Sequence, residues 1–81
     1  MRILIVGAGE VGSSIAGSLA DSHEVVVVDQ DAERVESIQY NEDVLGVTGD
    51  GTDLAVLREA DVAAADVVIA VTNDEETNLI V

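Results

Sequence analysis

A glycine-rich hexapeptide near the amino terminus is the first feature of this sequence that could bind a ligand. It follows an apolar run at Ile3–Val6, opens a segment of helical periodicity, and reads Gly7-Ala8-Gly9-Glu10-Val11-Gly12. In a strand–loop–helix setting, the first glycine of G-x-G-x-x-G permits a tight turn. The second lets a pyrophosphate approach the backbone, and the third lets the helix pack on the strand. The amides at the helix start would face the phosphates. The motif predicts a dinucleotide-binding loop; the alternative is that its glycines serve only close packing.

An acidic residue, Asp29, ends the second apolar run 22 residues after Gly7. A carboxylate at this position accepts hydrogen bonds from the ribose hydroxyls of adenosine. It also repels a 2′-phosphate, so NAD(H) is favoured over its phosphorylated analogue. Gln30 follows, and the nearest cation is Arg34, one turn into the next helix. Arg34 either contacts a phosphate or stacks on adenine, or it simply pairs with Asp31.

Two further turns follow predicted strands of the same sheet. The first is Gly49-Asp50-Gly51-Thr52, and the second begins at Thr72 and Asn73. The carboxyl ends of parallel strands meet at one edge, where ligands bind in open α/β sheets. Asp50 could contact the adenine amino group, and Thr72 the ribose or a phosphate. The alternative is that both segments are ordinary turns with helix caps.

No catalytic or metal centre is predicted. His23 is the only histidine and precedes the second strand, at the sheet edge opposite the loops. We expect it to be a solvated surface residue, and no nucleophile–base pair can be assembled. The acidic pair Asp50 and Asp53 and the acidic run at residues 74–76 are expected to be solvated rather than to hold a divalent cation. The chain is therefore expected not to be an enzyme.

The elements that must position these residues alternate between strands and helices. Strands are predicted at Ile3–Val6 (covered on both faces), Glu24–Asp29, Val44–Thr48 and Val67–Val71. One helix begins at Val11 with Val11, Ile15 and Leu19 on one face. A second helix holds Val35 and Ile38 and is capped by Asp31. A third is Leu54–Glu59, with Leu54 and Leu57 directed inward. A last helix begins at Asn73 or Asp74. Short links between strands and helices imply right-handed parallel crossovers. We therefore expect residues 1–81 to form an α/β, Rossmann-like sheet in the order 3-2-1-4 with flanking helices. It would be an incomplete, doubly wound domain.

Composition excludes several classes of partner. The chain has 17 acidic residues against three basic ones and a net charge of -14. This charge disfavours nucleic acid and anionic membranes. Molar salt shortens the screening length to roughly 3 Å and relieves the self-repulsion. We therefore expect a halophile's protein; the alternative is a specifically acidic binding surface. The sequence shows no signal peptide and no apolar run of roughly 20 residues, so a cytoplasmic location without membrane insertion is expected.

Four segments together resemble the TrkA amino-terminal domain, also called the RCK or KTN domain. They are Gly7–Gly12, Val28-Asp29, Gly49–Asp53 and Val71–Leu79. The resemblance covers the whole chain, and the sequence is similar in character to haloarchaeal members. The resemblance implies binding of NAD(H), or of ATP or ADP as in some members. It places the nucleotide contacts on the glycine loop, Asp29, the Asp50 turn and Thr72-Asn73. It further implies a dimer or ring on the cytoplasmic face of a membrane-embedded potassium transporter subunit. Relative to the family's pattern, residues 1–81 are expected to lack the remaining strands and the carboxyl-terminal domain.

The resemblance favours a regulatory NAD(H) sensor of potassium uptake that holds the nucleotide without turning it over. A second hypothesis is the cofactor-binding domain of an NAD-dependent dehydrogenase, with a catalytic domain beyond residue 81. A third is a structural dimerisation module.

Overall fold

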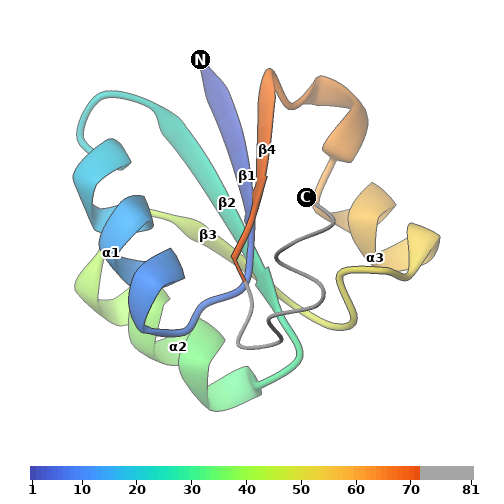
Figure 1. The fold of residues 1–81 in the computed structure, drawn as a ribbon, viewed down its shortest axis with the longest axis horizontal. Helices are drawn as coiled ribbons and strands as arrows, with labels where there is room; N and C mark the ends of the chain where they lie inside the picture. Colours follow the sequence, from blue (N-terminus) through green and yellow to red (C-terminus); the bar gives the residue numbers. More distant parts are fainter. Residues whose placement is uncertain (72–81) are drawn as a thin grey trace.

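The computed structural model describes residues 1–71 of the chain. Four parallel strands form one sheet: β1 (Arg2–Val6), β2 (Glu24–Asp29), β3 (Leu45–Thr48) and β4 (Val67–Ala70). Their order is β3-β2-β1-β4, which confirms the predicted topology (Figure 1). Ile5 at the centre of the sheet pairs with Val27 of β2 and Ile69 of β4. The strand bounds differ from the prediction by at most one residue at either end.

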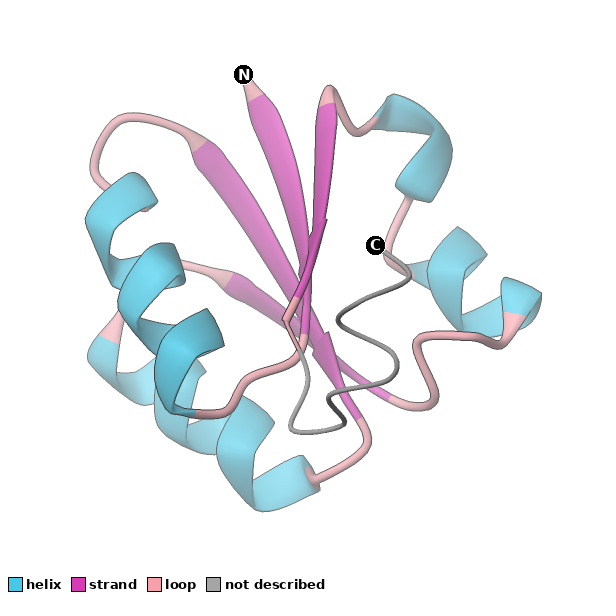
Figure 2. Ribbon diagram, in the orientation of Figure 1, coloured by secondary structure: helices cyan, strands magenta, loops and turns pink. Residues whose placement is uncertain are grey.

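Helices cover both faces of the sheet. Helices α1 (Glu10–Leu19) and α2 (Ala32–Asn41) lie on one face, and α3 (Leu54–Glu59) with the short helix η1 (Val62–Ala64) on the other (Figure 2). Asp31 caps α2 as predicted, because its side chain accepts a 2.9 Å hydrogen bond from the amide of Glu33. Asp53 caps α3 in the same way through the amide of Ala55. Helix η1 lies outside every predicted element.

The core has two layers, one on each side of the sheet. Between the sheet and α1/α2 lie buried side chains that include Ile3, Ile5, Val25, Val27, Ala16 and Ile38. Between the sheet and α3 lie Leu4, Val26, Val28 and Ala60. Consecutive side chains of a strand point to opposite faces. The central strands β1 and β2 therefore supply both layers, and β1 is covered on both faces as predicted.

Two expected core positions are wrong. Val11 is 58% exposed and Leu54 is 57% exposed. Helix α1 approaches the sheet through its small residues, since Gly12 and Ala16 are buried, and this turns Val11 toward solvent. In α3, Val56 and Leu57 pack against the core, whereas Leu54 directly follows the capping residue and lies outside.

Among residues 1–71, no helix is both long enough and apolar enough to cross a bilayer.

Candidate functional site

The glycine loop joins β1 to α1 at the carboxyl edge of the sheet. Gly7 has a φ of 114°, in the left-handed region that side chains disfavour, and its amide donates a 2.7 Å hydrogen bond to the carbonyl of Val28. Gly12 packs directly on the carbonyl of Gly7. Glycine is therefore required at residue 7 by its backbone conformation and at residue 12 by lack of space. These are the turn and close-packing roles expected from the sequence.

Helix α1 begins without a side-chain cap. Gly9 occupies the N-cap position, and the amide of Ser13 makes the first backbone hydrogen bond of the helix, 2.8 Å to the carbonyl of Gly9. The first amides of a helix have no intrahelical acceptor, and they carry the positive end of the helix dipole. The start of α1 can therefore donate hydrogen bonds to an anion.

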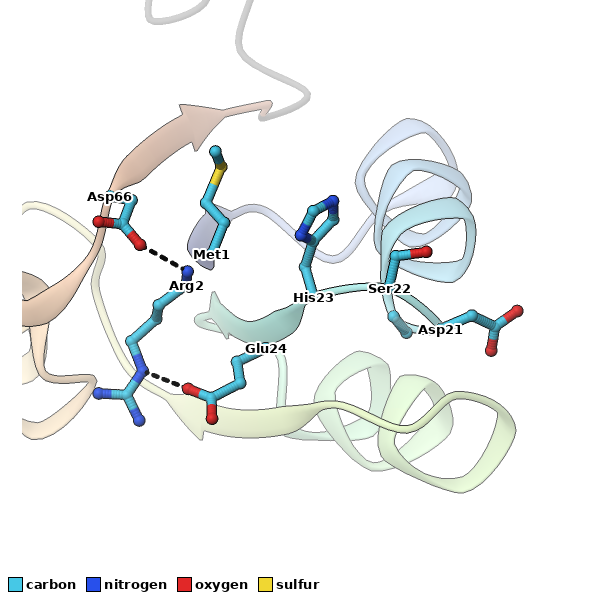
Figure 3. Close-up of a pocket in the computed structure, with 8 residues that line it drawn as sticks. Met1, Arg2, Asp21, Ser22, His23, Glu24 and Asp66 are labelled. Carbon is cyan, nitrogen blue, oxygen red and sulfur yellow. Dashed lines mark hydrogen bonds and ion pairs between the residues drawn. The ribbon is translucent and has the colours of Figure 1, made fainter.

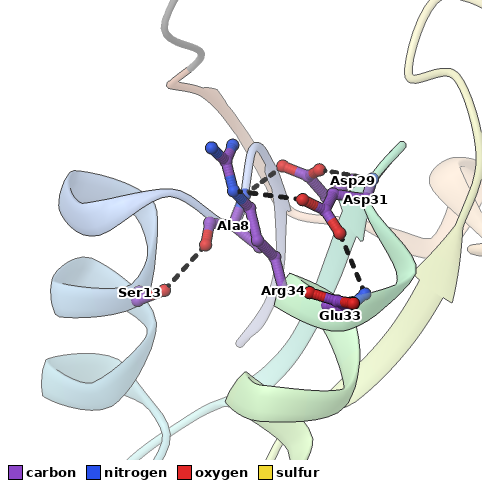
Figure 4. Close-up of polar contacts among 6 residues, drawn as sticks. All are labelled: Ala8, Ser13, Asp29, Asp31, Glu33 and Arg34. Atoms are coloured by element: carbon purple, nitrogen blue, oxygen red, sulfur yellow. Dashed lines mark hydrogen bonds and ion pairs between the residues drawn. The ribbon is translucent and has the colours of Figure 1, made fainter.

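Asp29 ends β2 beside the glycine loop. Its Oδ2 accepts a 2.7 Å hydrogen bond from the amide of Ala8, and its Oδ1 accepts a 2.8 Å hydrogen bond from the amide of Asp31 (Figure 4). The bond to Ala8 was not foreseen from the sequence. It connects two loops that are 21 residues apart.

Arg34 lies at the start of α2 and faces Asp31. Its Nε is 3.6 Å from Oδ2 of Asp31, and both side chains are about half exposed (Figure 4). The pairing that the sequence left open is therefore present. Both residues also line the cavity described below, so the ion pair does not remove Arg34 from reach of a ligand.

The turn after β3 is organised by Asp50. Its Oδ1 accepts hydrogen bonds from the amide and the hydroxyl of Thr52, at 2.8 and 2.7 Å. The amide bond, and then the hydroxyl bond, hold the pKa of Asp50 below its ordinary value. Gly51 packs against the side chain of Val6, whereas Gly49 packs against Val56. The two hydrogen bonds from Thr52 thus favour the ionised form of the Asp50 carboxylate, which lines the cavity described below.

These loops surround a cavity of about 650 Å³ at the carboxyl ends of β1, β2 and β4. Nine of its lining residues belong to the segments already described: Gly7, Gly9, Asp29, Gln30, Asp31, Arg34, Asp50, Gly51 and Thr52. The strand order reverses at β1 and β4, and this is where ligands bind in open α/β sheets. The structure therefore brings seven of the fourteen predicted site residues to one cavity.

Other predicted site residues lie differently. Ala8, in the middle of the glycine loop, is buried and does not line the cavity. Glu10 and Val11 are exposed on the first turn of α1, and Gly49 is half-buried outside the cavity lining. Thr72 and Asn73, and the helix expected to begin at Asn73 or Asp74, lie outside the described residues.

The apolar wall of the cavity was missed at the sequence level. It includes Leu57 of α3, Val62 of η1, and Val68 and Val71 from β4 and the residue that follows it. Side chains alternate along a strand, so Val68 could have been assigned to the α3 face once β4 was paired with β1. Leu57 and Val62 depend on how α3 and η1 pack, and no local signal indicates it.

A second, more open hollow of about 490 Å³ lies at the opposite edge of the sheet, around Arg2, His23, Glu24 and Asp66 (Figure 3). His23 lies here, away from the glycine loop, as predicted. Among residues 1–71, no cluster of three or more His, Asp or Glu side chains could hold a metal ion. Within residues 1–71, the glycine loop and the Asp50 turn line the larger cavity and not this hollow, so we take the larger cavity as the candidate functional site.

The parallel sheet, the glycine loop and the cavity at the strand ends define a Rossmann-like domain. The chain belongs to the TrkA-N domain family, whose profile matches residues 3–81.

Curated relatives carry the same domain. The chain is 45% identical over 80 residues to a Trk system potassium uptake protein TrkA homolog of Archaeoglobus fulgidus. It is 43% identical over 81 residues to the Trk system potassium uptake protein TrkA of Halomonas elongata. A TrkA homolog of Methanothermobacter thermautotrophicus is 35% identical over 81 residues. Each match covers 99% of this chain, but only 18%, 18% and 38% of the respective relative.

Proposed function

We propose that this domain binds NAD(H) in the cavity at the carboxyl edge of the sheet and acts as a nucleotide sensor. The observation that carries the proposal is the convergence of the glycine loop, Asp29 and the Asp50 turn on one cavity. Its volume lies in the range of small-molecule sites, roughly 300–1,000 Å³. Such a site holds a ligand by a few placed polar groups against an apolar wall.

Each part of the cavity suits one part of a dinucleotide. The turn at Gly7 and Gly9 and the backbone of Glu10 and Val11 would hold the pyrophosphate at the start of α1. Asp29, with Gln30 beside it, would hold the adenosine ribose, and Asp50 would contact the adenine amino group. Arg34 would stack on the adenine or contact a phosphate. We further propose that Thr72 and Asn73, which follow β4, contribute to the same site.

The charges around the cavity favour NAD(H) over ATP or ADP. Asp29, Asp31 and Asp50 bring three carboxylates to the cavity, and Arg34, which pairs with Asp31, lines it as well. Like charges repel, so a dinucleotide with one internal pyrophosphate is accepted more readily than a terminal triphosphate. The carboxylate of Asp29 would also exclude a 2′-phosphate.

We propose that the bound nucleotide regulates potassium uptake rather than undergoing reaction. The curated relatives are named Trk system potassium uptake proteins. In the full-length protein the domain would form a homodimer or ring on the cytoplasmic face, against a membrane-embedded potassium transporter subunit. Regulation requires the nucleotide to bind two conformations of that assembly with different affinities.

Calorimetry of the full-length protein in molar KCl tests this proposal. We expect NAD⁺ and NADH to bind more tightly than ATP and ADP, and Gly9→Ala and Asp29→Ala to lose most of the affinity. Gly17→Ala, on the same helix as the loop but away from the cavity, should bind as the wild type does. Sustained oxidation of NADH with a small carbonyl substrate would instead indicate a dehydrogenase. No binding of any of the four nucleotides would leave only a structural role.

A further inference from the structure

The backbone of Ala8, inside the glycine loop, is held from two sides. Its amide donates to Oδ2 of Asp29 at 2.7 Å, and its carbonyl accepts a 3.0 Å hydrogen bond from Oγ of Ser13 (Figure 4). Ala8 itself is only 4% exposed. The middle of the loop is therefore hydrogen-bonded both to the end of β2, through Asp29, and to α1, through Ser13.

These two bonds matter because they fix the residue that lies between the two glycines of the turn. Gly7 and Gly9 carry no side chains, and Gly7 has a φ of 114°. A buried amide or carbonyl that loses its partner is costly, so the Ala8 peptide is strongly biased toward this orientation. Asp29 is itself fixed, because its other oxygen accepts from the amide of Asp31 at 2.8 Å.

We propose that Asp29 and Ser13 are positioning residues for the pyrophosphate-binding loop. By fixing the Ala8 peptide they set the direction of the following amides, at Gly9, Glu10 and Val11, at the start of α1. This inference rests on the proposed nucleotide binding and assigns Asp29 a second task beside the ribose. A carboxylate offers about four acceptor positions, and Ala8 and Asp31 use two of them. The remaining positions are open to ribose hydroxyls, so one side chain couples ribose recognition to phosphate binding.

The two tasks of Asp29 can be separated with ligands that lack one of the recognised groups. We would measure binding of ADP, of 2′,3′-dideoxy-ADP, which has no ribose hydroxyls, and of adenosine, which has no phosphate. The full-length protein would be compared with Asp29→Asn and Ser13→Ala. Glu33→Gln is the control for loss of a charge near the same turn. Ser18→Ala is the control for loss of a serine, because Ser18 bonds only within its own helix.

We expect Asp29→Asn to weaken 2′,3′-dideoxy-ADP about tenfold, although this ligand has no hydroxyl for the carboxylate to contact. Ser13→Ala should weaken ADP and 2′,3′-dideoxy-ADP by the same factor, about fivefold, and leave adenosine unchanged. If Ser13→Ala lowered the affinity for all three ligands alike, the cause would be a general loosening of the fold, and that result would overturn the proposal. The controls should match the wild type.

Asp29→Asn could instead lower the affinity for ADP and leave the affinity for 2′,3′-dideoxy-ADP equal to that of the control variants. Asp29 then recognises only the ribose. The positioning role is then wrong while nucleotide binding stands. If the wild-type protein binds neither NADH nor ADP, the proposed function fails, and the positioning role fails with it.

Discussion

Gly12 lies so close to the backbone of Gly7 that a Cβ at residue 12 would overlap the carbonyl oxygen of Gly7 and lie 2.9 Å from its carbonyl carbon. Backbone atoms at the end of β1 cannot move aside without disturbing the sheet. Gly17, on the same helix, differs. A Cβ there would meet Oε1 of Glu42 at 2.9 Å, which is the end of a flexible side chain.

The two glycines therefore predict opposite effects of alanine. Gly12→Ala should lower the free energy of unfolding by about 3 kcal/mol, through overpacking against backbone. Gly17→Ala should leave it unchanged or raise it by up to about 1 kcal/mol, because alanine favours a helix interior. Urea denaturation in molar KCl measures both. Equal stability of the two variants would show that α1 can shift away from β1.

Nucleotide affinity should rise with salt, contrary to the behaviour of basic phosphate sites. The ligand is an anion, the net charge is -14, and Asp29, Asp31 and Asp50 line the cavity. Raising KCl from about 0.1 to 1 M shortens the screening length from about 10 to 3 Å and removes most of this repulsion. We expect the Kd for NADH to fall several-fold over that range in fluorescence titrations.

Neutralising one carboxylate at the cavity tests the cause of that salt dependence. Asp31→Asn should flatten it more than Asp43→Asn, which removes an exposed charge between α2 and β3. A Kd that rises with KCl would show that Arg34 and the helix start outweigh the acidic rim.

Arg2 should be a stabilising contact at the amino-terminal edge of the sheet. Its side chain donates to Oδ2 of Asp61 at 2.8 Å. Its Nε lies 3.3 Å from Oε2 of Glu24, within ion-pair distance but not hydrogen-bonded (Figure 3). The side chain is 31% exposed, so solvent weakens both ion pairs. Arg2→Met should lower the free energy of unfolding by about 1 kcal/mol at moderate salt. Arg58→Met removes the same charge from an exposed position on α3. If both variants lower the free energy of unfolding equally, the change in net charge rather than the loss of the ion pairs is responsible.

Thr52 should set the pKa of Asp50. Its amide and its hydroxyl both lower that pKa, so the ionised carboxylate stabilises the folded turn. Because the folded pKa lies below the unfolded one, this stabilisation is complete above the ordinary value of about 3.9 and is lost as the pH falls through the lowered value. Thr52→Val should raise the pKa of Asp50, as followed by NMR titration of its carboxyl carbon. Thr48→Val is the control, and identical titration curves would mean that the hydroxyl contributes nothing.

Much of the fold could be predicted from local pattern. The bounds of β2 and α3 and the cap at Asp31 follow from apolar runs and capping chemistry, and the strand order follows from the short crossovers. The wrong assignments, at Val11 and Leu54, have separate causes: Leu54 directly follows the capping residue of α3 and lies outside the core. For Val11, periodicity gives weight to large apolar side chains, whereas α1 packs through Gly12 and Ala16 because small residues let it approach the sheet.

The lining of the cavity was predictable at the ends of the strands, whereas the contacts between separate segments were not. Gly7, Asp29 and Asp50 could be expected there because each lies at or just after the carboxyl end of a parallel strand. The bond from Ala8 to Asp29 depends on the distance between two separate loops, and the apolar wall at Leu57 and Val62 depends on the packing of α3 and η1. Neither has a signature in the residues next to it.

Strand β4 leaves one side of the sheet open within residues 1–71. It pairs with β1 alone there, and its β-branched side chains Val67 and Val68 are 38% and 49% exposed. An open edge of this kind accepts another strand, whether from further along the polypeptide or from a neighbouring molecule. Mutual repulsion between such acidic molecules opposes the second outcome in dilute buffer and fades in concentrated salt. Salt that relieves the repulsion within each molecule would therefore also weaken the repulsion that opposes aggregation through this edge.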